Sequence, residues 1–197
     1  MSVDDVSKVL AEVPEQVRML RRRDFIALAE QGAFDDDDED VELLFGVVVV
    51  REQTSPEHEY ACRALARRLV RQLGDRADVC TNLSLAASEY SLPRPDVFVV
   101  PAKDDWHEHP SRAFLVVEVA RTSVRKDREL KRRLYGMADV DEYWIVNVID
   151  REVEVYRDAV DGEYRTRTVH HPGEVLHLAA FPDVSVAVAD IVPPAEG

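Results

Sequence analysis

The sequence predicts an α/β fold in which helices pack on a mixed β-sheet. Short apolar runs of strand length, such as 97–100 and 114–117, alternate with segments of helical period, such as 55–74 and 124–138. Their order is helix, three strands, helix, strand, and more strand-like runs follow residue 150. We therefore predict an αβββαβ core, with an extra helix and hairpin before it and β additions after it.

The N-terminal part is predicted to hold one or two helices, an acidic loop and a hairpin. Residues 15–31 show helical spacing of apolar side chains, and a second short helix could begin at Arg23 and end near Gly32. The acidic run 35–40 predicts a solvated or disordered segment, because like charges in series repel. The apolar runs on either side of Gly46 predict a hairpin.

The first helix of the core has a clear start. Ser55 suits the N-cap, Pro56 the first helical position and Glu57 the first turn, so we expect a helix that ends near Gly74. His58 falls on the apolar face that packs inward, although a first-turn histidine can equally be a capping or packing residue.

The remaining elements follow from alternating and helical patterns. Strands are predicted at 79–85, 96–100, 113–120, 142–148, 152–157, 164–169, 175–178 and 184–188, with a helix at 124–138. No internal repeat and no Ser/Gly-rich linker interrupts the chain. We expect one domain over 1–197, with an N-terminal extension over 1–40 and a C-terminal β extension over 158–197.

Composition excludes several classes of protein. No apolar run approaches the roughly 20 residues of a membrane helix, and the N-terminus lacks the apolar region of a signal peptide. Cys62 and Cys80 are too few for a disulfide framework or a zinc site, and both are predicted to be buried thiols. We expect a cytoplasmic protein with no membrane partner.

The formal net charge of −14 argues against a nucleic-acid partner, but the charges are unevenly distributed. Acids gather in 35–40, whereas bases gather in two helical segments, 63–71 and 125–133. The basic segments are either solvated helix faces or a basic patch on an acidic protein.

Glu118 is the most informative residue of the sequence. The period of the strand 113–120 places it on the face of Val116 and Ala120, where a carboxylate loses its hydration. This costs several kcal/mol unless the group is paired or binds a metal. The other interpretations are a buried pair with an arginine, or a strand end in solvent.

Asp96 follows Pro95 at the start of the preceding strand. Pro-Asp is also a common turn, and Pro182 with Asp183 opens a strand in the same way, so the dipeptide alone is not specific. Asp96 differs from Asp183 because a strand bearing Glu118 comes next.

The helix after Glu118 carries Asp127, Lys131 and Tyr135 at i, i+4 and i+8, so they share a stripe beside the apolar face. That apolar face is formed by Leu130, Leu134, Met137 and Ala138. An ordinary Asp127–Lys131 helix pair would explain the stripe as well. Two carboxylates on neighbouring strands with a lysine suit Mg²⁺ and phosphate chemistry. The lysine could orient water and stabilise developing charge.

These residues resemble the PD-(D/E)XK nuclease superfamily, and in particular its Uma-type branch of restriction endonucleases, over roughly 20–185. The matching motifs are Pro95-Asp96, Glu118-Val119, Asp127-x3-Lys131-x3-Tyr135, Val140-x-Glu142-Tyr143-Trp144-x-Val146, Glu42-x3-Gly46 and Ser55-Pro56-x-His58. Ala120 stands where the superfamily has its strand lysine, Asp139 replaces a glycine, and 121–123 replaces Ser-Pro-Ser.

The resemblance implies a Mg²⁺-dependent endonuclease of restriction-endonuclease-like fold, with Mn²⁺ as a substitute metal. Asp96 and Glu118 would hold the metal, Lys131 would serve the water or the scissile phosphate, and Glu42 and His58 would line the site. The implied partners are double-stranded or branched DNA and a second copy of the chain in a homodimer.

Two other functions stay open at this point. The net charge and the missing strand lysine favour a catalytically inactive nuclease-fold protein with a regulatory or interaction role. A metal-dependent hydrolase of small phosphate esters would need no basic groove.

Overall fold

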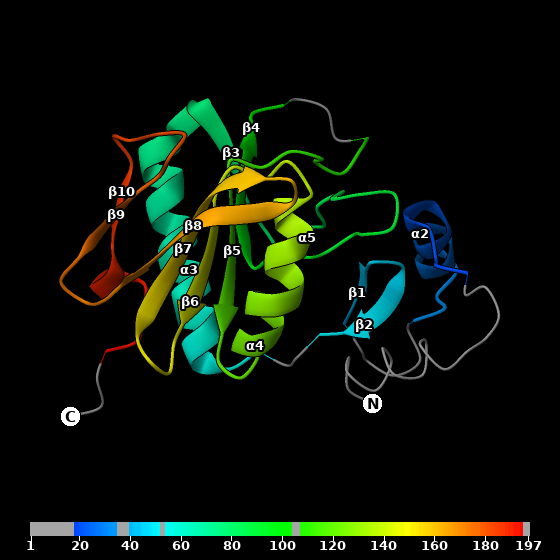
Figure 1. Cartoon of the computed structure of the whole chain (residues 1–197), viewed down its shortest axis with the longest axis horizontal. Helices are drawn as coiled ribbons and strands as arrows, with labels where there is room; N and C mark the ends of the chain where they lie inside the picture. Colours follow the sequence, from blue (N-terminus) through cyan, green and yellow to red (C-terminus); the bar gives the residue numbers. More distant parts are fainter. Residues whose placement is uncertain (1–17, 35–39, 52–53, 104–106, 195–197) are drawn as a thin grey trace.

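A six-stranded mixed sheet forms the centre of the protein (Figure 1). The structure is a computed structural model, and it describes residues 18–34, 40–51, 54–103 and 107–194. The sheet is ordered β3-β4-β5-β6-β7-β8. Its strands are β3 (Ala77–Thr81), β4 (Val97–Pro101), β5 (Leu115–Ala120), β6 (Tyr143–Asn147), β7 (Glu152–Val160) and β8 (Glu163–His170). Only β5 and β6 are parallel among these neighbours, which confirms the predicted mixed sheet.

Helices cover both faces of this sheet (Figure 1). The helices are α2 (Arg22–Glu30), α3 (Pro56–Leu73), α4 (Val124–Lys126), the π-helix η2 (Asp127–Lys131) and α5 (Arg132–Gly136), with short 3₁₀ turns η1 (Gly74–Arg76) and η3 (Val188–Asp190). The continuous helix α4–η2–α5 forms the crossover between the parallel strands β5 and β6. The predicted order helix, three strands, helix, strand is therefore confirmed.

Two antiparallel strand pairs flank the core: the first is the predicted hairpin, and the second joins two of the predicted C-terminal strands. They are β1 (Val41–Leu44) with β2 (Val47–Val50), and β9 (Val175–His177) with β10 (Ser185–Ala187). The first hairpin docks on the loop before β4, where Leu43 and Leu92 exchange backbone hydrogen bonds. Gly46 at its turn has φ +78°, and a Cβ there would lie 2.6 Å from Met19 Cβ.

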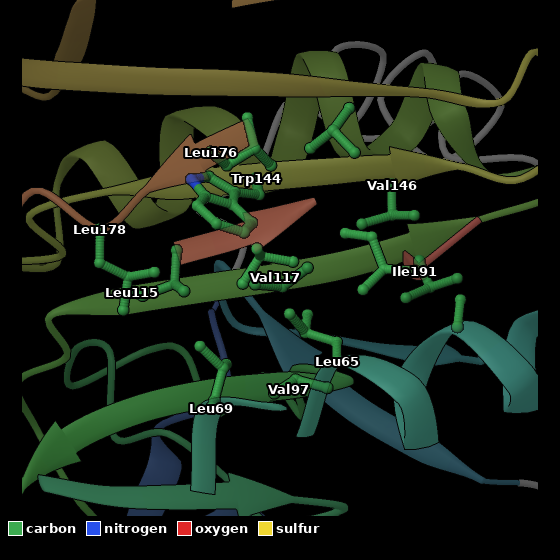
Figure 2. Packing of buried hydrophobic residues seen from close by; sticks show 14 of the residues in the cluster. Leu65, Leu69, Val97, Leu115, Val117, Trp144, Val146, Leu176, Leu178 and Ile191 are labelled. Atoms are coloured by element: carbon green, nitrogen blue, oxygen red, sulfur yellow. The ribbon is translucent and has the colours of Figure 1, made fainter. Parts of the chain in front are cut away.

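The larger core cluster lies between the sheet and α3, and the C-terminal segment closes it (Figure 2). Leu65 and Leu69 of α3 pack with Val117 of β5 and with Trp144 of β6. The indole N–H of Trp144 donates to Glu142 Oε1 at 2.8 Å, so its polar atom is satisfied inside the core. This face carries the odd-numbered residues of β5, which places Glu118 on the opposite face, as predicted.

Three expectations about the elements are corrected. Of the helix predicted over 15–31, residues 15–17 lie outside the described residues and 18–21 are not helical, since the amide of Leu20 donates to Gly46 O of the hairpin. The second short helix predicted from Arg23 to near Gly32 agrees with α2. The strand predicted over 79–85 covers 77–81, because Asn82 takes φ +54° and ends the ladder. The strand predicted over 152–157 continues to Val160. Most of the acidic run 35–40 lies outside the described residues.

The crossover helix α4–η2–α5 differs from the predicted helix 124–138 in its winding. Residues 127–131 form a π-helical turn, in which one extra residue fits into the turn, and such turns often occur at functional sites. The stripe of Asp127, Lys131 and Tyr135 is fully buried, whereas Met137 is 61% exposed. The stripe was predicted to flank the buried face; it is part of that face. None of the helices in the described ranges is long and apolar enough to cross a membrane.

Candidate active site

A cavity of about 110 Å³ opens where the start of α3 meets β4 and β5. Its lining residues are Arg51, Thr54, Ser55, His58, Asp96, Glu118, Val119, Arg121, Thr122, Ser123, Lys126 and Lys131. Asp96 and Glu118 are the two carboxylates among them. The site is therefore built from two neighbouring strands, the first turn of one helix and the first turns of another.

Asp96 stands directly before β4 and is held by three donors. Its Oδ1 accepts from Arg51 at 3.0 Å, and its Oδ2 accepts from the backbone amide of Val119 at 2.7 Å. His58 Nε2 lies 3.1 Å from the same Oδ2. Burial alone would raise the pKa of Asp96, but His58 and the charge of Lys131 outweigh it and lower that pKa. Asp96 is therefore a carboxylate at neutral pH.

Glu118 lies within β5, 3% exposed, on the face covered by the π-helical turn. Its Oε1 accepts from the hydroxyl of Tyr135 at 2.6 Å and lies 3.0 Å from Lys131 Nζ. Burial, together with the carboxylates of Asp96 and Asp127, raises the pKa of Glu118 to about 8, against the opposing effect of Lys131. In the metal-free protein most of the Glu118 side chains are therefore protonated at pH 7.

Lys131 forms ion pairs with Glu118 of β5 and with Glu42 of the hairpin β1-β2. Its Nζ lies 3.2 Å from Glu42 Oε1 as well as 3.0 Å from Glu118 Oε1, and the side chain is 2% exposed. Burial would lower the pKa of Lys131, but Glu118, Glu42 and Asp127 reverse this effect and raise it. The lysine therefore carries its charge at every working pH, which excludes it as a general base in this state.

Glu42 reaches the site because the hairpin β1-β2 docks beside the loop before β4. Its Oε2 accepts from the backbone amide of Arg94 at 3.2 Å. Its Oε1 is buried and has only ion-pair contacts, with Lys131 and, at 3.8 Å, with Lys126. Glu42 thereby positions the ammonium group of Lys131.

The charge balance of the site favours a cation. Glu42, Asp96, Glu118 and Asp127 are four buried carboxylates, and Lys131 is the one fully buried cation beside them in the described chain. The mutual repulsion of these carboxylates contributes to the raised pKa of Glu118. Asp96 and Glu118 offer hard oxygen ligands from adjacent strands to one cavity, and this donor set fits Mg²⁺.

All five residues predicted from the sequence lie in or beside this cavity: Glu42, His58, Asp96, Glu118 and Lys131. Their roles stay predictions. Sequence reasoning missed Arg51, which follows β2 and pairs with both Asp96 and Asp40. No local signal marks this arginine, because its position depends on how the hairpin docks on the core.

A second hollow, of about 850 Å³, joins the site along α3. It shares His58 and Asp96 with the cavity and is also lined by Arg63, Arg67 and Arg71. These arginines are exposed and make no ion pair with any described residue. Four-residue steps along a helix put successive side chains about 6 Å apart. The hollow therefore presents a row of exposed arginines that ends at the candidate site, where the acids Glu59 and Asp96 also line it.

Comparisons with known proteins agree with this description. The family model Uma2, described as putative restriction endonuclease, matches residues 22–189. A similar solved structure is a putative nuclease belonging to DUF820 from Anabaena variabilis ATCC 29413. It has a TM-score of 0.66 at 12% identity, over 83% of this chain and 96% of that chain, and this likeness establishes the predicted restriction-endonuclease-like fold. No curated protein matches the sequence significantly.

Proposed function

Because the chain belongs to the Uma2 family of putative restriction endonucleases, we propose that it is a metal-dependent endonuclease that hydrolyses DNA phosphodiester bonds. The observation that carries the proposal is the convergence of Asp96, Glu118 and Lys131 on one cavity. Nuclease-type hydrolysis needs a cation, a water and a positive group near the phosphate, and this arrangement can provide all three.

Asp96 and Glu118 would hold Mg²⁺, for which Mn²⁺ can substitute. When bound, the cation supplies Lewis-acid stabilisation of phosphate charge and lowers the pKa of water. Arg51 and the Val119 amide fix the orientation of the Asp96 carboxylate. The permanent charge of Lys131 stabilises the negative charge that develops on the phosphate oxygens as water attacks and the P–O bond breaks.

Removal of the metal is expected to abolish cleavage. Plasmid or branched DNA incubated with the protein should be cut in Mg²⁺ or Mn²⁺ and left intact in EDTA, as gels of the products would show. The Asp96→Asn protein, purified identically, controls for contaminating nucleases. Asp183→Asn is the matched Pro-Asp control, because Asp183 is an exposed partner of Arg76 far from the cavity. Equal cutting by wild type and Asp96→Asn would refute the proposal.

The same assay separates the alternative function. A wild-type protein that binds DNA without cutting it in either metal would be an inactive nuclease-fold protein with an interaction role. We also propose a homodimer, since cutting both strands of a duplex requires two sites.

The arginine row offers a route for the DNA backbone despite the net charge of −14. Replacement of Arg63, Arg67 and Arg71 together by alanine should weaken DNA binding measured by fluorescence anisotropy in EDTA. If each arginine contacts one phosphate, the slope of log K against log salt should become shallower by about 2 to 3.

Arg68→Ala is the matched control for the arginine row. Arg68 lies on the same helix but its Nε is 3.0 Å from Asp190 Oδ2, so this arginine is already neutralised. The control should leave the salt dependence almost unchanged. A triple variant with the same slope as Arg68→Ala would show that DNA does not follow the row.

A further inference from the structure

Three potential metal ligands converge on the rim of the candidate site. His58 and Cys62 lie one turn apart on α3, and Asp96 lies directly before β4. One ligand atom from each residue falls within 4.8 Å of the other two, and this is the one such three-residue group found in the described ranges. The cluster contains a thiol, so its chemistry differs from that of the Asp96–Glu118 pair.

Two of the three ligand pairs are spaced close to those of a tetrahedral metal centre, and the third pair, Asp96 with Cys62, lies within 4.8 Å. Zinc bonds of about 2.0–2.1 Å to nitrogen, 2.0–2.2 Å to oxygen and 2.3 Å to sulfur put ligand atoms about 3.4–3.6 Å apart at tetrahedral angles. In the structure His58 Nε2 lies 3.1 Å from Asp96 Oδ2 and 3.8 Å from Cys62 Sγ. Small side-chain shifts would therefore accommodate the ion, with water as the fourth ligand.

The surroundings also suit a bound ion. Arg51 and the Val119 amide donate to Asp96, and such outer contacts orient a ligating carboxylate. Cys62, His58 and Asp96 all line the hollow that carries the arginine row, so an ion can enter from solvent. Burial and the charges of Asp96 and Glu118 raise the pKa of the Cys62 thiol, so the cation must displace its proton on binding. The resulting thiolate and the imidazole favour zinc over magnesium.

We propose that His58, Cys62 and Asp96 form a second cation site that takes Zn²⁺ or a similar thiophilic ion. Because Asp96 belongs to both sites, occupation of the thiol site removes a ligand from the magnesium site. Zinc therefore inhibits DNA cleavage. The inhibition rests on the proposed nuclease function, whereas the binding does not. The sequence excluded zinc by its count of cysteines, but one cysteine suffices when the fold adds a histidine and an aspartate.

Cobalt binding tests the site without any activity assay. Titration of the full chain with Co²⁺ should produce the near-ultraviolet absorption band of thiolate-to-cobalt charge transfer, and Zn²⁺ should abolish the band by displacement. Cys62→Ser should lose the band and bind Zn²⁺ more weakly by on the order of tenfold or more in calorimetry. Cys80→Ser is the matched control, because Cys80 is a free, half-buried thiol outside the cluster.

A DNA-cleavage assay tests the proposed inhibition by zinc. Zn²⁺ should inhibit Mg²⁺-supported cleavage by wild type and Cys80→Ser, and Cys62→Ser should need on the order of tenfold more zinc for the same inhibition, with its zinc-free activity retained. Circular dichroism confirms folding, and Cys62→Ala replaces the serine variant if it fails. Absence of a thiolate band, or equal zinc binding by wild type and Cys62→Ser, would overturn the site. If wild type shows the band but no metal supports cleavage, the nuclease proposal fails and the zinc site stands.

Discussion

Replacement of Glu118 by glutamine should reduce metal-dependent DNA cleavage by about a hundredfold to a thousandfold. Glutamine has the same shape and can still accept from Tyr135, but its neutral amide is a poor ligand for a hard cation. The rate should be measured with DNA in excess at saturating Mg²⁺ or Mn²⁺. Glu129→Gln is the control, since Glu129 is an exposed residue of the following helix that forms an i,i+4 pair with Arg125. Cleavage by Glu118→Gln at the wild-type rate would remove Glu118 from the mechanism.

The same variant should change the pH dependence of stability. Because the pKa of Glu118 is raised from 4.5 to about 8, the unfolded chain ionises this group first as pH rises, which lowers wild-type stability across that window. Glutamine does not titrate, so Glu118→Gln should match wild type near pH 4.5 and become more stable than wild type above pH 8. The gain in the free energy of unfolding above pH 8 should be on the order of a few kcal/mol. Urea unfolding at several pH values measures the free energy of unfolding of both proteins. A difference between them that does not change with pH would contradict the raised pKa of Glu118.

Replacement of Lys131 by methionine should destabilise the metal-free protein by about 3–5 kcal/mol at pH 9. The change removes the ammonium group that lies 3.0 Å from Glu118 and 3.2 Å from Glu42, and leaves buried carboxylates without a counter-charge. At pH 5 the loss should be smaller, because Glu118 can take up a proton. Urea unfolding of the metal-free variant at both pH values checks this.

Lys126→Met is the matched control for Lys131. Lys126 is partly exposed and its only ion pair in the described structure is the 3.8 Å contact with Glu42, so its loss should cost less than about 1 kcal/mol. A double-mutant cycle with Glu42→Gln and Lys131→Met should show positive coupling, because removal of both partners leaves fewer unpaired charges. Equal stability of the Lys131→Met and Lys126→Met proteins would show that the buried ion-pair network does not hold the site together.

The faces of the core elements could be predicted because their periods are short and local. The twofold period of β5 separated Glu118 from Val117, and four-residue spacing joined Asp127, Lys131 and Tyr135. The features that could not be predicted from the sequence depend on tertiary contacts. The π-helical turn turned the polar stripe inward, and the docking of the hairpin brought Arg51 to Asp96. Neither event leaves a pattern in the local sequence.

The zinc cluster shows the same limit. His58 was predicted to lie on the inward face of its helix and Cys62 to be buried, and the structure places both side chains beside the start of β4. The helical pattern relates these two residues to each other, but it carries no information about Asp96, which lies 38 and 34 positions later. Only the packing of α3 on the sheet completes the set of ligands.

The central claim is that Asp96 and Glu118 together hold the catalytic cation. A crystal of the protein soaked in Mn²⁺ and measured at a wavelength where manganese scatters anomalously tests it most directly. We predict an anomalous peak bonded to a carboxylate oxygen of Asp96 and to one of Glu118, with Lys131 lining the same cavity. A peak that contacts neither carboxylate, or that contacts Asp96 while Glu118 stays on Tyr135 and Lys131 without a metal bond, would contradict the claim.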